Sequence, residues 1–202
     1  MTRLLLLRHG QSTWNAEGRW QGWADVPLSP LGEQQAADAA AHLAGLGLAK
    51  AYSSSLERAH RTATIIADAL GLGAVETDPD LRERNVGPFT GRTMDDIRST
   101  WPECFDPDTG RLLRVPDGED DEALWARALP ALRRIGARSA EPTLVVSHGG
   151  VIRSIERHLE AKPPPSTPNL GGRWFEVDGD QLTAGEPYFP VEPSLATSPG
   201  TE

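Results

Sequence analysis

Two short apolar runs that each lead into a histidine constrain the fold of this chain most. Residues 4–7 are four consecutive leucines that lead into Arg8 and His9, and the apolar run 143–147 leads directly into His148. Continuous apolar runs of this length are typical of strands that are buried on both faces of a parallel sheet. In such sheets ligands bind beyond the carboxyl ends of the strands, so we expect His9 and His148 to lie at that edge.

Helical patterns alternate with short strands along the rest of the chain. We expect helices over residues 31–46, 56–70, 93–101, 119–140 and 151–159, strands over 50–53 and 75–77, and a hairpin of 174–177 with 182–188. Ser29 and Pro30 begin the first helix, as a side-chain cap followed by a proline at the first helical position. Alternation of this kind predicts an α/β fold with a largely parallel sheet.

The length of 202 residues fits one domain, and we expect a single domain over residues 1–189. Within it, prolines and glycines among polar residues in 102–118 predict a long surface excursion, which we place over the site. The prolines, serines and threonines of 190–202 predict a flexible C-terminal tail.

Charge narrows the class of ligand. The net charge is −9 and no basic tract is present, so we expect no general binding to nucleic acid or to an anionic membrane. Lys50 and Lys162 are the only lysines, and arginine binds oxygen anions in a two-pronged fashion that lysine cannot match. An anion site would therefore be a local, concentrated pocket.

The apolar run 4–7 is too short to span a membrane, and the single cysteine, Cys104, fits a reducing compartment. We therefore predict a cytoplasmic protein.

A group of polar residues surrounds the first histidine. Arg8 precedes His9, Arg58 lies near the start of a predicted helix, and glycines follow both His9 and His148. A single histidine at a strand end is more often structural than catalytic. Two arginines and a second histidine, however, would make a poor hydrophobic core and a good binding site for a tetrahedral dianion.

Four motifs in order resemble the histidine phosphatase superfamily, also called the phosphoglycerate mutase-like family. They are Arg8-His9-Gly10-Gln11-Ser12-Thr13-Trp14-Asn15, then Ser54-Ser55-Leu56-Glu57-Arg58-Ala59-His60-Arg61-Thr62-Ala63, then Leu81-Arg82-Glu83 with Gly87 and Gly91, and finally Ser147-His148-Gly149-Gly150. One Arg-His-Gly would be weak evidence, whereas four ordered motifs over about three quarters of the chain are specific. The resemblance implies a three-layer α/β/α sandwich with a mostly parallel central sheet.

The resemblance also implies a role for each central residue. His9 would be the nucleophile that becomes phosphohistidine, while Arg8, Arg58 and His148 would bind the phosphoryl oxygens. Glu83 would protonate the leaving alkoxide and then act as the base for the incoming water. The expected ligand is a small phosphorylated metabolite, with no metal and no cofactor. A homo-oligomer is compatible with the family, which includes monomers, dimers and tetramers.

Supporting residues follow from the same match. Ser12 and Asn15 occupy positions that reach phosphate in the family, although each also fits simple turn chemistry. Gln21, Gly22 and Gly149 are expected to contact substrate. We interpret three other histidines, His42, His60 and His158, as structural. Three tryptophans lie close together in the sequence, at Trp14, Trp20 and Trp23. They either line a pocket or hold a loop against the core, and we favour the second use for at least one of them.

The motifs do not separate hydrolases from mutases. Family mutases resemble one another in a His-Tyr pair after the acid glutamate and in adjacent arginines on a longer insertion. This chain has Asn85-Val86 after Glu83-Arg84, and Arg111 and Arg114 are not adjacent. We therefore predict a phosphomonoesterase, with a cofactor-dependent phosphoglycerate mutase as the alternative because residues 22–29 are mutase-like. A non-catalytic phospho-ligand-binding domain is a remote alternative. Such a domain would be expected to lose the nucleophile or the acid, and this chain has both.

Overall fold

A computed structural model describes residues 1–160 and 166–190 of the chain. Its centre is a six-stranded sheet with the strand order β3-β2-β4-β1-β5-β6. The strands are β1 (Thr2–Arg8), β2 (Lys50–Ser54), β3 (Glu76–Asp78), β4 (Thr143–Ser147), β5 (Gly172–Asp178) and β6 (Gln181–Tyr188). The first four pair in parallel, whereas β5 and β6 are antiparallel to their neighbours. The mostly parallel sheet and the C-terminal hairpin are thus confirmed.

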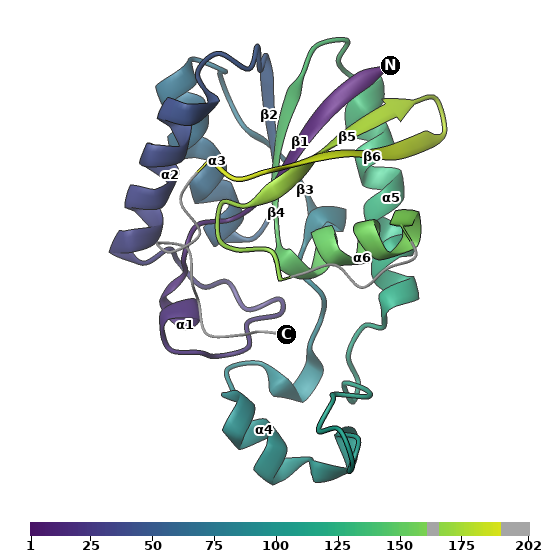
Figure 1. Cartoon of the computed structure of the whole chain (residues 1–202). Coiled ribbons are helices and arrows are strands. Elements are labelled where there is room, and N and C mark those ends of the chain that lie inside the picture. Colours follow the sequence, from purple (N-terminus) through teal and green to yellow (C-terminus); the bar gives the residue numbers. More distant parts are fainter. Residues whose placement is uncertain (161–165, 191–202) are drawn as a thin grey trace.

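Helices cover both faces of the sheet, which gives the predicted α/β/α sandwich (Figure 1). The helices are α1 (Thr13–Ala16), α2 (Pro30–Leu43), α3 (Glu57–Leu70), α4 (Met94–Thr100), α5 (Asp121–Ala137) and α6 (Gly149–Glu160). In the view of Figure 1, α2 and α3 lie on one side of the sheet and α5 and α6 on the other. Each of the five predicted helices is present, with ends within a few residues of those expected.

Strand β1 shows why its sequence is apolar at every position. Leu4 and Leu6 pack in one buried cluster with side chains of α5 and α6, while Leu5 and Leu7 pack in a second with side chains of α2 and α3. Successive side chains of a strand point to opposite faces, so a strand covered on both faces needs apolar residues throughout. This central position carries the end of β1, and with it His9, to the middle of the carboxyl edge.

Residues 86–118, which we call the cap, form a lobe beside that edge and contain α4 (Figure 1). The cap has a small hydrophobic core that includes Phe89, Ile97, Cys104 and Phe105, and Trp20 packs into it from outside. The segment 102–118, expected as a surface excursion, therefore contributes buried side chains as well as exposed ones. Of the predicted tail 190–202, only Pro190 is among the described residues.

Candidate active site

His9 lies directly after β1, where its backbone N–H donates to the carbonyl of Ser147 at the end of β4. The ring is buried, and its Nδ1 lies 2.6 Å from the carbonyl oxygen of Gly10. A carbonyl can only accept, so Nδ1 carries the proton and Nε2 keeps a lone pair. Arg58 Nε donates to that Nε2 across 3.3 Å. Burial, reinforced by the charges of Arg58 and Arg8, lowers the pKa of His9 well below 6.5, so the imidazole is neutral at physiological pH.

The two arginines of the first two motifs are fixed by backbone carbonyls. Arg8 donates to the carbonyl of Thr167 (2.7 Å), and Arg58 donates to those of Ala24 (2.8 Å) and Gly22 (2.9 Å). Burial lowers the pKa of Arg8 and the pKa of Arg58 to about 10, which leaves both charged at neutral pH. Both guanidiniums are therefore held in place before any ligand arrives, so little order is lost on binding.

His148 follows β4 and lies beside His9, with the two ring centroids 5.1 Å apart. Its Nε2 lies 2.9 Å from the hydroxyl of Ser54, which follows from the parallel pairing of β2 with β4. Burial and, after it, the charge of Arg58 lower the pKa of His148 well below 6.5. Its buried Nδ1 has no hydrogen-bond partner among the described residues. A buried nitrogen of this kind is costly unless a ligand uses it.

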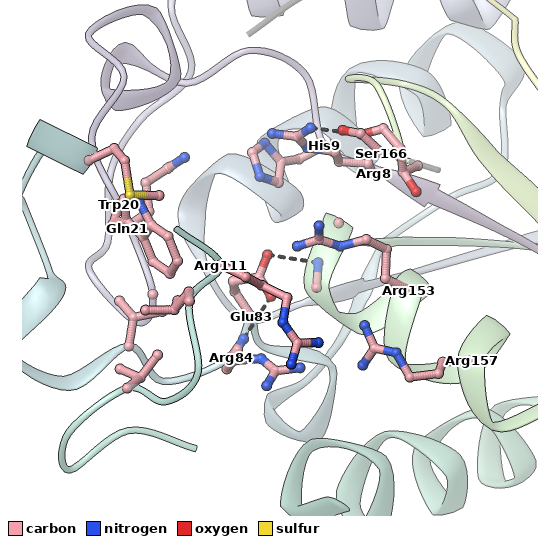
Figure 2. A pocket seen from close by; sticks show the side chains of 18 of the residues that line it. Arg8, His9, Trp20, Gln21, Glu83, Arg84, Arg111, Arg153, Arg157 and Ser166 are labelled. Atoms are coloured by element: carbon pink, nitrogen blue, oxygen red, sulfur yellow. Dashed lines mark hydrogen bonds between the residues drawn. The ribbon is translucent and has the colours of Figure 1, made fainter. Parts of the chain in front are cut away.

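Glu83 lies across the pocket from His9 in the irregular segment that leads into the cap (Figure 2). One carboxyl oxygen accepts from the N–H of Arg84 (2.7 Å) and the other from the N–H of Gly150 (3.1 Å), in the first turn of α6. A Cβ at position 150 would overlap the carboxyl group. A side chain at the second glycine of Ser147-His148-Gly149-Gly150 would therefore displace the Glu83 carboxyl group from this position.

The pocket between these groups has a volume of about 580 Å³. Of the residues predicted from the sequence, those that line it are Arg8, His9, Gln21, Gly22, Arg58, Glu83 and Gly149. His148, Ser12 and Asn15 are buried beside these residues and are not among those that line the pocket. Ser12 caps α1, accepting from the N–H of Asn15 and donating to Gln21, so the turn chemistry named above is present at these positions. The Asn15 side-chain nitrogen is buried without a hydrogen-bond partner in the described part of the chain.

The residues interpreted as structural are placed as follows. His60 lies 3.3 Å from the hydroxyl of Ser53, and His158 stacks on Trp125 with centroids 4.5 Å apart. His42 lies in the last turn of α2 and is exposed. The tryptophans divide between the two expected uses: Trp20 lines the pocket and packs into the cap core, whereas Trp23 donates to the carbonyl of Glu83 across 2.6 Å.

In Figure 2, Arg84, Arg111 and Arg157 lie around Glu83 and away from His9. They belong to a group of five further arginines that line the pocket and to which sequence reasoning gave no role in the site. The five are Arg84, Arg98, Arg111, Arg153 and Arg157. The chain has 20 basic residues, of which two are lysines and 18 are arginines. Seven of the 18 arginines line this pocket. Among its described lining residues, Glu83 is the only carboxylate. Asp121, just behind, accepts from both Arg84 and Arg157 at 2.6 Å. The spacing of Arg153 and Arg157, four residues apart after the Gly-Gly pair, was the available signal.

These groups form a site that can hold and transfer a phosphoryl group. The neutral imidazole offers a lone pair, two fixed guanidiniums flank it, and a carboxyl group faces it (Figure 2). Within the described residues, no group of three or more histidine, cysteine or acidic side chains is arranged to hold a metal ion. Likewise, no helix there is long and apolar enough to cross a membrane.

An α/β sandwich with a buried, neutral histidine between arginines at the carboxyl edge is the arrangement of a phosphoryl-transfer protein. The chain belongs to the histidine phosphatase superfamily (branch 1), whose family model matches residues 4–178. The resemblance given by the four motifs is thereby confirmed, and so is the fold that it implied.

The relatives include both mutases and phosphatases. Phosphoglycerate mutase-like protein 4 of Arabidopsis thaliana is 40% identical over 89% of this chain and 82% of its own. A 2,3-bisphosphoglycerate-dependent phosphoglycerate mutase of Bradyrhizobium is 36% identical over 80% and 82%. A metal-independent phosphoserine phosphatase of Arabidopsis thaliana is 37% identical over 77% and 67%. Among solved structures, a mycobacterial glucosyl-3-phosphoglycerate phosphatase has a TM-score of 0.75 at 28% identity, covering 91% of this chain and 96% of that one.

Proposed function

We propose that this protein is a metal-independent phosphomonoesterase that acts through a phosphohistidine at His9. The observation that carries the proposal is the hydrogen-bond pattern of His9. Nδ1 faces a carbonyl oxygen and so carries the proton, which leaves the lone pair of the neutral ring on Nε2, where Arg58 donates to it. The metal-independent phosphoserine phosphatase among the relatives supports the same chemistry.

The reaction takes two steps. In the first, His9 Nε2 attacks phosphorus, the phosphorus–oxygen ester bond breaks, and the Glu83 carboxyl gives its proton to the leaving oxygen. In the second, water attacks phosphorus and transfers a proton to the Glu83 carboxylate as the phosphorus–nitrogen bond breaks. Inorganic phosphate leaves, and neutral His9 and protonated Glu83 are restored.

Fixed cations stabilise the charge that the transferring phosphoryl group carries. Arg8 and Arg58 are anchored by carbonyls at 2.7–2.9 Å, so they need little reorganisation during the reaction. We assign the Nδ1 of His148 to a phosphoryl oxygen because that nitrogen has no partner in the described residues. Ser12, Asn15, Gln21, Gly22 and Gly149 complete the proposed substrate contacts, with Ser12 acting through its hydrogen bond to Gln21.

We assign the arginine-rich end of the pocket to a carboxylate on the substrate. Arginine matches carboxylate geometry with two parallel hydrogen bonds, and Arg111 and Arg153 face the same space as Glu83 (Figure 2). Relatives named for phosphoserine and for glucosyl-3-phosphoglycerate act on phosphate esters that also carry a carboxylate. The proposed substrate class is therefore a small phosphorylated carboxylic acid.

Phosphoglycerate mutase activity is the second candidate. The surplus of arginines at the distal end also suits the second phosphate of a bisphosphoglycerate, and the relative from Bradyrhizobium is a mutase. In that case the phosphohistidine would return its phosphoryl group to a sugar acid instead of water.

One experiment separates the two candidates. The purified protein with EDTA is given 3-phosphoglycerate, phosphoserine and glycerol 3-phosphate, and both inorganic phosphate and 2-phosphoglycerate are measured, with and without added 2,3-bisphosphoglycerate. We expect phosphate release without the bisphosphate, and faster release from the two acids than from glycerol 3-phosphate, which lacks the carboxylate. Fast isomerisation with little phosphate release would favour the mutase instead.

A further inference from the structure

Glu83 lies in an irregular stretch that follows a short 3₁₀ helix (Pro79–Leu81), and the carbonyls of residues 80–83 all have side-chain donors. Ser147 donates to the carbonyl of Leu81 across 2.8 Å. Arg127 of α5 reaches the other three carbonyls, those of Asp80 (2.6 Å), Arg82 (2.7 Å) and Glu83 (2.9 Å), the last of which also accepts from Trp23. One guanidinium therefore fixes the backbone on both sides of the proposed acid.

Arg127 is itself held in one orientation by Glu119. The two side chains form a two-pronged ion pair with N–O distances of 2.6 and 2.7 Å, and both are mostly buried, at 17% and 12% exposed. Glu119 also joins the two ends of the cap, since its carboxylate accepts from the N–H of Asn85 and its own N–H donates to the carbonyl of Asn85. The pair thus lies where the cap meets the sheet.

We propose that Arg127, with Glu119, is a positioning residue for the general acid Glu83. The inference rests on the proposed function, because it gives Glu83 the role of proton donor. One of the two N–H groups that hold the Glu83 carboxyl group belongs to the adjacent Arg84, so the position of the carboxyl group depends on the path of this backbone. That path is fixed by a planar, five-donor side chain on a helix, and lysine cannot reproduce such a set of bonds. A displacement of about 1 Å is enough to cost 10²-fold in rate.

The test uses the dependence of rate on the leaving group, which a merely structural role would not change. Arg127→Lys and Glu119→Gln are compared with wild type on an alkyl phosphate and on p-nitrophenyl phosphate, whose leaving group needs little protonation. We expect phosphohistidine formation to slow by about 10- to 100-fold with the alkyl ester and by less than about threefold with the aryl ester. In the Glu83→Gln background, Arg127→Lys should add almost no further loss on the alkyl ester, because the acid is already absent.

Arg134→Gln is the matched control. Arg134 lies on the same helix and pairs with the carboxylates of Asp78 and Asp80, but it does not bond the carbonyls of residues 82 and 83. It should keep both rates. Thermal unfolding of each variant is followed in parallel, and Glu119→Gln, which retains its oxygen acceptor, serves if Arg127→Lys fails to fold.

The outcomes distinguish this inference from the proposed function. If Glu83→Gln shows the leaving-group effect and the folded Arg127 and Glu119 variants do not, the positioning role is wrong and the proposed acid stands. Equal losses on both esters in those variants would likewise overturn it, because they would indicate general damage to the pocket. If Glu83→Gln itself shows no such effect, the proposed function is wrong in its choice of acid.

Discussion

The two ends of the pocket are built in different ways, and the difference separates chemistry from selectivity. At the His9 end, the functional groups follow β1 and β4 or begin α3, and they are buried with backbone carbonyls as partners. At the distal end, arginines come from the cap, from the segment just before it and from α6, and two of them share Asp121. A rigid, buried end is suited to one reaction on any phosphate ester. A solvated end that includes an irregular lobe is suited to choosing among esters.

The largest expected effect tests the buried end. His9→Ala should abolish turnover on every substrate, because His9 is the proposed acceptor of the phosphoryl group and the only histidine among the described residues lining the pocket. An acid-labile, base-stable phosphate should be trapped on the wild-type protein and not on this variant. His60→Ala, which removes a histidine of the same helix as Arg58, is the matched control and should keep its activity. Near-normal turnover in His9→Ala would contradict the covalent route.

The next effect tests the group that joins the two ends. Glu83→Gln should slow alkyl phosphates by about 10²- to 10⁴-fold, the usual contribution of general acid catalysis. Phosphohistidine formation from p-nitrophenyl phosphate should slow much less, and rapid-quench single turnovers measure that step apart from hydrolysis. A small and equal loss on both esters would make Glu83 a structural carboxylate, and the acid would then have to be sought elsewhere in the pocket.

The same contrast explains what the sequence could predict. The residues around His9 follow two strands whose apolar runs are unmistakable, because both faces of the sheet are covered and no polar position interrupts them. Once these strands are placed side by side, His9 and His148 follow neighbouring strand ends at the carboxyl edge. Their ring centroids lie 5.1 Å apart.

The distal end has no such pattern. The cap core is formed by side chains such as Phe89, Ile97 and Cys104, which come from short elements separated by turns. Neither a helical nor a strand period links them, so the segment 102–118 reads as a polar loop. The approach of Arg111 to Glu83 depends on how that lobe folds over the sheet edge, and no local rule predicts it. The role of Arg127 is equally hidden from the sequence, since its partners are carbonyls of a short 3₁₀ helix and of the irregular stretch after it.

A smaller effect tests the distal end alone. Arg111→Gln should lower kcat/KM for 3-phosphoglycerate by about tenfold, the loss expected when one charged hydrogen-bond donor to a carboxylate is removed. The value for p-nitrophenyl phosphate, which has no carboxylate, should change little. Arg114→Gln is the matched control, because Arg114 is an exposed cap arginine that does not line the pocket. Equal losses on both substrates would show that Arg111 acts on the phosphate end after all.

The smallest effect concerns stability and again belongs to the buried end. Burial lowers the pKa of His9 and the pKa of His148 below 6.5 in the folded protein, while both titrate near 6.5 when unfolded. Below pH 6.5 the unfolded chain therefore binds protons that the folded protein does not, and the free energy of unfolding falls as the pH falls. Each histidine contributes up to about 1.4 kcal/mol per pH unit until its folded pKa is reached. Urea unfolding of wild type and His9→Ala between pH 6.5 and 5 should show a shallower loss in the variant at an unchanged m value. Identical slopes would mean that His9 is charged in the fold, which would contradict the neutral nucleophile on which the comparison of the two ends depends.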